Sequence, residues 1–513
     1  MAMKICLIRP PILQLKSNFS FFGACLPIGL AYIAAIIRQE GHEVFVIDAA
    51  GSALERFEAI PSSLDSLTRQ GLSPDDIVER IPPDSRIVGM TNMFLHEWPL
   101  LCEIAEKIKK RYPSMIIILG GENATAFWNR IFEETDAVDY CVLGEGEHKI
   151  IELIHALESG EATSSLPGVA AYKSGPSQAI PPSKRIQHID ALPRPAWDLI
   201  PVENYLAKKD AWGVHRGRSM PILATRGCPY ACTFCSNASM WGNRYITRPP
   251  ADVVDEIKTY VQSYNINNLN FCDLTSIIRK EWIREFCDIL SQQPFSLTWQ
   301  LPTGTRSEAL DFETLRMMYK TGCRNIVLAP ESGSERLLRV MKKNVKLANV
   351  LSAVRSACKA GMYVRINMIV GHPEETLRDQ FQSLLFLIKA AWIGCQDAAL
   401  MMFAPYPGSA DTNKLIQEGR MTWGTDYYYS SLARSGKSSR TYNPRMGRQF
   451  LVFSQYFLCL MFYLTAYITR PWRLFFLIRN FFIGTENTQI DQLLRTKWHL
   501  LRTKDSGLAL NNA

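Results

Sequence analysis

The sequence predicts an α/β protein with three parts: a doubly wound, Rossmann-like domain, a second βα-repeating unit that forms a partial six-stranded barrel, and a helical C-terminal region. Three observations support this. Short apolar runs alternate with helical patterns over residues 1–175, the alternation resumes over 221–412 after a proline-rich connector at 176–220, and residues 413–513 are basic and aromatic. A chain of 513 residues is long enough for such a division into domains.

The first unit contains five expected strands separated by helices. Ser73 is a helix N-cap with Pro74 at the first helical position. Ligands on such sheets bind beyond the carboxyl ends of the strands, which places Pro10, Thr91–Phe94, Gly120–Glu122 and Gly144–Gly146 at the candidate site. None of these loops is a GxGxxG fingerprint, and each glycine pair also suits an ordinary tight turn. The expected strands are Lys4–Arg9, Glu43–Asp48, Arg86–Thr91, Met115–Leu119 and Asp139–Leu143, and the other expected helices are Gly29–Glu40, Trp98–Tyr112 and Glu147–Glu158.

The second unit repeats the βα alternation often enough for an open six-stranded barrel. Its expected strands are Ile222–Thr225, Asn268–Cys272, Ser296–Gln300, Asn325–Ala329, Tyr363–Val370 and Ala398–Phe403. The expected helices between them are Ala251–Tyr264, Glu281–Gln292, Phe312–Lys320, Leu347–Ala360 and Leu377–Ala390.

Composition narrows the class of protein and its compartment. A hydrophobic content of 47% with 11% aromatic residues excludes disorder as the main state, and the size excludes a small disulfide-stapled fold. The N-terminus lacks the apolar core and cleavage site of a signal peptide. We therefore expect a cytoplasmic protein, whose 13 cysteines are reduced and whose one cysteine cluster binds metal.

That cluster is Cys228, Cys232 and Cys235, spaced Cx3Cx2C directly after an expected strand. Three thiolates in one loop fit a 4Fe–4S cluster with one iron left open to another molecule. A structural zinc site would need a fourth ligand, and none follows within twenty residues of Cys235. Zinc stays open as an alternative through His215, which lies upstream.

With Phe234 before the last cysteine, this segment resembles the hallmark loop of the radical S-adenosylmethionine (radical SAM) enzymes. The segments Glu331–Ser334, Asn367–Thr376 and Ala404–Ser409 are similar to later segments of the same family. The resemblance implies that the three cysteines bind a 4Fe–4S cluster, that SAM chelates the open iron, and that its reductive cleavage gives a 5′-deoxyadenosyl radical. The implied SAM contacts are Phe234, Asp273, Glu331, Ser332 and Asn367, although Asp273 follows Cys272 where the family often has two adjacent acids.

A Rossmann-like domain before such a barrel resembles the cobalamin-binding radical SAM class. The segments Pro27–Ile37, Gly120–Thr125, Gly144–Glu147 and Asp190–Pro201 carry this resemblance. No DxHxxG loop is present, so cobalamin would bind without a histidine ligand, as is common in this class; a domain that has lost cobalamin is the alternative. The implied cobalamin contacts are Thr91, Asn92, Met93, Gly120, Gly121, Glu122, Gly144, Glu145 and Gly146.

The resemblance implies a methyltransferase that uses the cluster, SAM and cobalamin to methylate an unactivated carbon, or phosphorus, of a small-molecule or hydrophobic substrate. A radical oxidative cyclase or ring-rearranging enzyme without methyl transfer is the first alternative, and a non-catalytic cobalamin or iron–sulfur sensor is the second. A flavodoxin- or ferredoxin-type protein is the expected electron donor. The sequence assigns no catalytic residue and names no substrate. His372 and Tyr427–Tyr429 are interpreted as a loop histidine with satisfied hydrogen bonds and as loop aromatics that pack.

The C-terminal region holds the net charge of the chain. Residues 430–513 contain 12 Lys and Arg and 3 Asp and Glu, a charge of +9, so the remaining residues sum to −1 out of a total of +8. Gln449–Thr469 is uncharged over 21 residues, which leaves three interpretations: a helical cap on the barrel, a peripheral contact with the inner face of the membrane, or a span. Nucleic acid is not an expected partner, because the basic residues alternate with bulky apolar ones.

Overall fold

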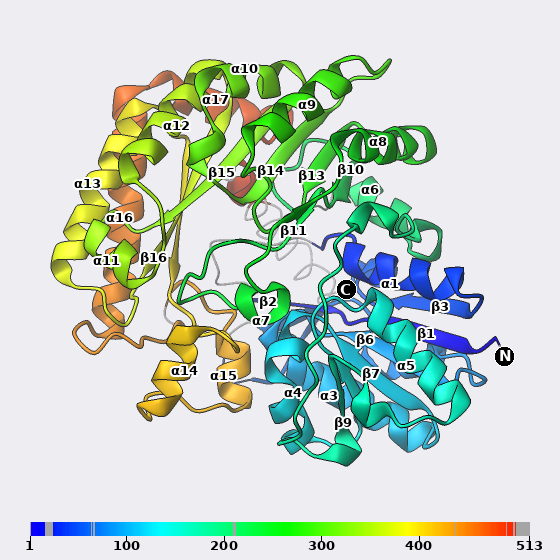
Figure 1. The fold of residues 1–513 in the computed structure, drawn as a ribbon. Coiled ribbons are helices and arrows are strands. Elements are labelled where there is room, and N and C mark those ends of the chain that lie inside the picture. Colours follow the sequence, from blue (N-terminus) through cyan, green and yellow to red (C-terminus); the bar gives the residue numbers. More distant parts are fainter. Residues whose placement is uncertain are drawn as a thin grey trace, which may run out of the picture.

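The computed structural model describes residues 2–15, 24–62, 64, 67–208, 212–436, 438–488, 490–495 and 498. It contains two six-stranded sheets, one in the N-terminal part and one in the green and yellow part of the chain, with the segment of residues 225–241 between them (Figure 1). The expected α/β fold, in which a Rossmann-like domain precedes a partial barrel and a helical C-terminal region, is confirmed. The exact residues at which the domains divide stay a prediction.

The first sheet has the order β3-β1-β6-β7-β8-β9, with the first five strands parallel and β9 antiparallel to β8. Alternate residues of β1 enter different cores: Ile5 and Leu7 pack with α1 and α5, whereas Cys6 and Ile8 pack with α3 and α4 on the opposite face. The strands are β1 (Lys4–Arg9), β3 (Glu43–Asp48), β6 (Ile87–Thr91), β7 (Ile116–Gly120), β8 (Tyr140–Val142) and β9 (Val169–Ala171). The helices are α1 (Ile28–Gln39), α2 (Pro74–Arg80), α3 (Trp98–Arg111), α4 (Glu122–Glu134) and α5 (Glu147–Ser159).

Local signals explain several of these elements. The predicted cap of α2 is present: Ser73 accepts a hydrogen bond from the backbone N–H of Asp76 at 3.1 Å, within a capping box. Helix α4 was not expected, because its sequence ENATAFWNRIFEE mixes polar and apolar residues without a strong start signal. A small antiparallel sheet of β2 (Ile12–Leu15), β5 (Leu67–Gln70) and β4 (Phe57–Ala59) was also not expected.

The second sheet is parallel throughout and follows chain order, with β10 and β17 as its two edges. Its helices lie on the outside of the curved sheet (Figure 1). The strands are β10 (Ser219–Ile222), β13 (Asn268–Phe271), β14 (Thr298–Thr305), β15 (Cys323–Glu331), β16 (Tyr363–Val370) and β17 (Asp397–Met402). The helices are α8 (Pro250–Tyr264), α9 (Lys280–Ser291), α10 (Phe312–Lys320), α11 (Glu335–Val340), α12 (Leu347–Ala360) and α13 (Leu377–Ile393).

One strand was predicted in the wrong place. The first barrel strand was expected at Ile222–Thr225, but β10 starts at Ser219 and ends at Ile222. Pro221 lies inside it and pairs with Asn270 on one side only. An edge strand tolerates a proline because its outer N–H groups need no partner in the sheet.

The C-terminal region is helical over its described residues. α14 (Ala410–Gln417) and α15 (Thr425–Ser430) precede α16 (Arg448–Thr469) and α17 (Trp472–Ile483). α16 packs on α13 and β17 (Figure 1), and its Gln455 donates to the carbonyl oxygens of Leu400 at 2.6 Å and Arg434 at 3.0 Å. By length and composition alone, α16 is the one helix of the described residues that could cross a membrane. Tyr427–Tyr429, expected in a loop, lie in α15, where Tyr427 and Tyr428 are buried.

Candidate active site

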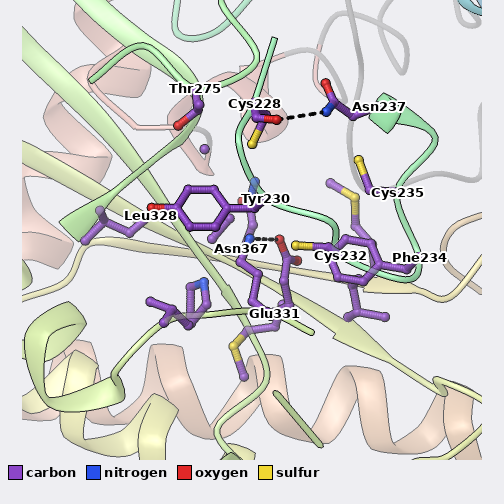
Figure 2. Close-up of a pocket in the computed structure, with 18 of the residues that line it drawn as sticks. Cys228, Tyr230, Cys232, Phe234, Cys235, Asn237, Thr275, Leu328, Glu331 and Asn367 are labelled. Atoms are coloured by element: carbon purple, nitrogen blue, oxygen red, sulfur yellow. Dashed lines mark hydrogen bonds and ion pairs between the residues drawn. The ribbon is translucent and has the colours of Figure 1, made fainter. Parts of the chain in front are cut away.

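The three cysteines of the Cx3Cx2C loop line one cavity of about 420 Å³ (Figure 2). The loop follows β11 (Thr225–Arg226), and the cavity lies at the carboxyl ends of β14 to β17. The three thiols are free, and no further cysteine or histidine of the described residues lines this cavity. His215, the zinc alternative, is bound elsewhere, to Gln492 at 3.0 Å and Glu486 at 3.4 Å. The donor set therefore fits an iron–sulfur cluster with three protein ligands and one open iron.

Hydrogen bonds from two other segments hold the cysteine loop in place. Thr233, between two of the cysteines, donates its backbone N–H to Met341 O at 3.0 Å and its hydroxyl to Asp411 Oδ2 at 2.8 Å. His372 Nε2 lies 3.0 Å from the same carboxylate oxygen. His372 is fully buried and does not line the cavity, so it supports the loop indirectly through Asp411.

Three of the five expected SAM contacts line the cavity: Phe234, Glu331 and Asn367 (Figure 2). Glu331 ends β15 with a φ of 71°, a conformation that non-glycine residues rarely adopt. Its carboxylate accepts a hydrogen bond from Lys343 Nζ at 3.0 Å. The pKa of Lys343 is raised, because the burial that opposes its charge is outweighed by the attraction of Glu331.

The other two expected SAM contacts do not line the cavity. Asp273 is fully buried, and its Oδ1 accepts a hydrogen bond from the backbone N–H of Ala224 at 3.0 Å and another from that of Thr225. Burial raises the pKa of Asp273 to about 7. Ser332 is fully buried beside α13, 3.4 Å from the Ser383 hydroxyl. Each residue is next in the chain to a residue that lines the cavity, Leu274 or Glu331, and the role of both as SAM contacts stays a prediction.

The cavity is surrounded by polar atoms that have no hydrogen-bond partner in the described structure. Native proteins satisfy almost all such buried groups, so unsatisfied atoms gathered in one cavity indicate a missing polar ligand. SAM, with its amino, carboxylate and ribose hydroxyl groups, has the matching donors and acceptors. These atoms are Thr275 Oγ1, Thr305 Oγ1, Arg306 Nε, Ser307 Oγ, Asn367 Oδ1 and the Tyr406 hydroxyl.

The expected cobalamin loops lie side by side at the carboxyl ends of β6, β7 and β8, because Thr91 pairs with Gly120 and Gly120 with Val142. Gly121 has a φ of 114°, and a Cβ there would lie 2.7 Å from Asn92 O, so only glycine fits. Asn92 is fully buried and accepts a hydrogen bond from the Asn123 side chain at 2.7 Å. Met93 is 42% exposed, and a Cβ at Gly120 would meet nothing closer than 3.9 Å, so other described residues do not crowd these two positions of the edge.

The third loop of this set connects the two domains. Glu145 and Glu147, in the GEGE segment, pair with Arg226, the residue that precedes the cysteine loop, at 3.2 and 2.5 Å. Arg185 of the connector also binds Glu145, at 2.5 Å. The side chains of Arg226, Glu145 and Glu147 are each at most 7% exposed. Glu145 thus forms interdomain ion pairs here, and its expected cobalamin contact stays a prediction.

A second connection follows the cysteine loop. Ser236, next to Cys235, donates a hydrogen bond to Glu122 of the second expected cobalamin loop. Helix α7 (Asn237–Trp241) then reaches the third loop, where a Cβ at Gly144 would lie 3.4 Å from Met240 O. The cysteine loop is therefore anchored at both ends on loops of the N-terminal domain.

Several charged residues of the cavity were missed by sequence reasoning. Arg306 stacks on Tyr230 with its guanidinium 3.9 Å from the ring centroid. Lys343 and Arg434 also line the cavity, and neither belongs to a recognisable motif.

Comparisons with known proteins agree with this arrangement. The model of the radical SAM superfamily matches residues 222–387, and that of the B12 binding domain matches residues 19–154. An uncharacterized methyltransferase of Pyrococcus horikoshii is 26% identical over 408 residues, covering 79% of this chain and 82% of its own. The anaerobic magnesium-protoporphyrin IX monomethyl ester cyclase of Synechocystis is 23% identical over 437 residues, covering 84% and 81%. The solved structure of the radical S-adenosylmethionine methyltransferase TsrM from Kitasatospora setae, with cobalamin and a [4Fe-4S] cluster bound, shares the fold with a TM-score of 0.66 at 17% identity, covering 89% of this chain and 91% of that one.

Proposed function

Since this chain belongs to the radical SAM enzymes with an N-terminal B12-binding domain, we propose that it transfers a methyl group to an unactivated carbon, or phosphorus, of a small molecule. One observation supports the proposal: the loop that brings the three cysteines to the cavity is anchored on the expected cobalamin loops through Arg226 and Ser236. A substrate in this cavity would have access to both cofactors, and positioning of that kind lowers the barrier for transfer between them.

The residues of the chain have separable tasks in this reaction. When bound, the reduced cluster supplies the electron that cleaves SAM to a hydrogen-abstracting radical, and cobalamin carries the methyl group. We propose that Cys228, Cys232 and Cys235 hold the cluster and that Asn367 and Glu331 orient SAM, with Lys343 keeping the Glu331 carboxylate in place. The apolar wall of Met401, Met402 and Phe403 excludes water from the radical.

The experiment that tests this proposal measures two products. The reconstituted holoenzyme is given SAM, a reductant and candidate substrates, and both 5′-deoxyadenosine and S-adenosylhomocysteine are quantified. Methyl transfer requires both products and a substrate that gains the mass of a methylene group. Substrate-dependent 5′-deoxyadenosine without S-adenosylhomocysteine would refute methyl transfer and favour an oxidative cyclisation. Neither product from intact holoenzyme would favour the sensor. A Cys232→Ala variant serves as the control without SAM cleavage.

The electron donor and the membrane contact also belong to this proposal. A one-electron donor of the flavodoxin or ferredoxin type would reduce the cluster. The apolar surface of α13, α16 and α17 would contact a lipid bilayer, since from Arg448 to Gly484 the chain has no acidic residue and faces outward with large apolar side chains. The most exposed of these side chains are Leu377, Phe381, Trp392, Phe453, Leu460, Ile468, Phe475, Phe482 and Ile483.

Vesicle flotation tests the membrane contact. The full chain is mixed with vesicles of phosphatidylcholine, alone or with phosphatidylglycerol, and we expect it to float with both. Replacing both Phe475 and Phe482 by Ser should weaken binding by about tenfold per substitution, because each exposed ring loses apolar burial in lipid. Phe57→Ser is the matched control, since Phe57 is 49% exposed in the N-terminal part of the chain. Wild-type protein that stays with the unbound fraction would refute the contact.

A further inference from the structure

The cavity carries more positive charge than its own ion pairs neutralise. Its charged lining residues are Arg306, Lys343, Arg434 and Glu331. Lys343 is paired with Glu331, and Arg306 with Glu308 at 2.9 Å. Arg434 has no carboxylate within ion-pair distance among the described residues.

Arg434 is built into the cavity wall. Its carbonyl oxygen accepts hydrogen bonds from the backbone N–H of Met402, at the end of β17, at 2.9 Å and from Gln455 of α16 at 3.0 Å. Its guanidinium lies 5.1 Å from the ring centroid of Tyr406 and 3.7 Å from Met401 Sδ. The backbone is thus fixed to the sheet, while the charged group turns into the cavity among apolar and aromatic side chains.

A buried donor without an acceptor lies beside this arginine. The hydroxyl of Tyr406 is buried and has no hydrogen-bond partner in the described structure, and Tyr406 lines the same cavity. Among the described residues the Arg434 guanidinium has only the weakly accepting thioether of Met401, and the Tyr406 hydroxyl has no acceptor, so the two form a donor set suited to a carboxylate or phosphate oxygen.

Arg434 lies close to the N-terminal domain. Ala433, the residue before it, is buried in one hydrophobic cluster with Leu95, which belongs to the segment that directly follows the expected cobalamin loop at Thr91–Met93. Burial, together with the charge of Arg434, lowers the pKa of His96 in that segment to about 3. His96 itself stacks on Phe94 at 5.4 Å. Arg434 therefore lies where the barrel cavity meets the cobalamin domain, which is where a substrate must reach both cofactors.

From these contacts we propose that Arg434 and Tyr406 bind an anionic group of the substrate, and that the substrate combines a carboxylate or phosphate with an apolar body that packs against Met401, Met402 and Phe403. The inference rests on the proposed function, since it takes the ligand of this subsite to be the molecule that is methylated. Arg434 acts here as a substrate-binding and specificity-determining residue.

The test is a binding measurement that needs no turnover. The cluster-loaded holoenzyme is titrated with 4-(trifluoromethyl)phenylacetate and with the neutral 4-(trifluoromethyl)phenylacetamide, followed by fluorine NMR. We expect the wild type to bind the carboxylate at least about tenfold more tightly than the amide, as a charge-assisted hydrogen bond provides. Arg434→Gln should abolish this preference, Arg434→Lys should retain part of it, and the exposed surface variant Arg445→Gln should keep it.

Two further measurements distinguish binding of a substrate anion by Arg434 from binding of the carboxylate of SAM. The affinity for SAM, measured by equilibrium dialysis, should be unchanged in Arg434→Gln; a loss equal to the loss of the carboxylate probe would assign Arg434 to the carboxylate of SAM and overturn the proposal. Equal binding of the two probes to the wild type would also overturn it. An absence of methyl transfer with intact carboxylate preference would count against the proposed reaction alone, so the two failures are distinguishable.

Discussion

The ion pairs that join the cysteine loop to the N-terminal domain allow a quantitative prediction through the substitution Arg226→Met. Glu147 pairs with Arg226 at 2.5 Å, and their side chains are 7% and 5% exposed. Glu145 keeps Arg185 and the backbone N–H of Ile186 after the substitution, whereas Glu147 loses its ion-pair partner. Removing one member of a buried pair costs about 3–5 kcal/mol, because the other charge stays buried without compensation.

The loss should depend on pH with a defined sign. In the native chain the pKa of Glu147 is lowered, because burial, which raises it, is outweighed by Arg226. Its charge therefore adds stability above the pKa of the unfolded chain, at about 4.3, and that stability is lost as the pH falls through the lower folded value. Without Arg226 only a backbone hydrogen bond and the charge of His148 oppose burial, the largest influence, so we expect the folded pKa to rise above the unfolded one and the variant to lose stability as the pH increases. The difference between the two proteins should grow between about pH 5 and about pH 8.

Urea unfolding at several pH values, followed by tryptophan fluorescence, measures the difference in stability between the wild type and Arg226→Met. The ring centroid of Trp241 lies 5.9 Å from the Arg226 guanidinium, so its fluorescence reports on this region directly. Adding Glu147→Gln to Arg226→Met should restore at least about 2 kcal/mol at pH 8, because it removes the uncompensated charge. Arg244→Met, at an exposed position in the same region, should change stability by less than about 0.5 kcal/mol. If Arg226→Met lowered the free energy of unfolding by less than about 1 kcal/mol, or by the same amount at about pH 5 and about pH 8, this reasoning would be refuted.

Three other substitutions test the cavity and the cobalamin loops. Cys232→Ala should reduce the iron content per chain and reductive SAM cleavage to background while the apo-protein keeps its melting temperature; wild-type iron content would contradict the cluster assignment. Gly121→Ala places a Cβ 2.7 Å from a backbone oxygen at a φ of 114°, so it should lower the free energy of unfolding in urea by about 1–3 kcal/mol and weaken cobalamin binding in a spectral titration. The control is Gly29→Ala, in open space at the start of α1, which should not destabilise the protein. Lys343→Met leaves the carboxylate of Glu331, a proposed SAM contact, without its ion-pair partner, and equilibrium dialysis should show SAM affinity reduced by about tenfold or more, with Lys343→Arg close to wild type.

The sequence was most informative where chemistry depends on close spacing. The three cysteines lie within eight residues, so their convergence on one cavity follows from a single loop. The βα alternation likewise predicted the five parallel strands of the first sheet, but not β9, and it predicted the six strands of the second sheet with β10 misplaced, because apolar runs and helix caps are local signals. The position of β10 was predicted wrongly, and only the order of strands in the sheet shows that it is an edge strand, in which Pro221 is tolerated.

Residues that act through distant partners could not be predicted in this way. Asp273 follows its strand as a SAM ligand would, but only the packed structure shows its carboxylate bonded to the backbone N–H groups of Ala224 and Thr225. Arg434 belongs to an irregular segment roughly two hundred residues after the cysteine loop, and its orientation depends on Met402 and Gln455. No local pattern distinguishes it from the other arginines of the C-terminal region.

The contacts of the arginines in the C-terminal region indicate whether electrostatic attraction or apolar burial would dominate binding to a membrane. Residues 430–513 carry a charge of +9, which by itself suggests electrostatic attraction to anionic lipid. Arg434 faces the cavity, while Arg470 and Arg473 donate to carbonyl oxygens at the end of α13. Within α16 and α17, the remaining arginines are Arg448 and Arg479, which are exposed and have no bonded partner among the described residues. At about 1 kcal/mol for each basic residue near an anionic surface, they contribute less than the exposed aromatic and aliphatic side chains, at about 1.5–3 kcal/mol for each one fully buried. Vesicle binding should therefore persist in high salt and on neutral lipid, and binding that required phosphatidylglycerol would show that charge, rather than apolar area, makes the contact.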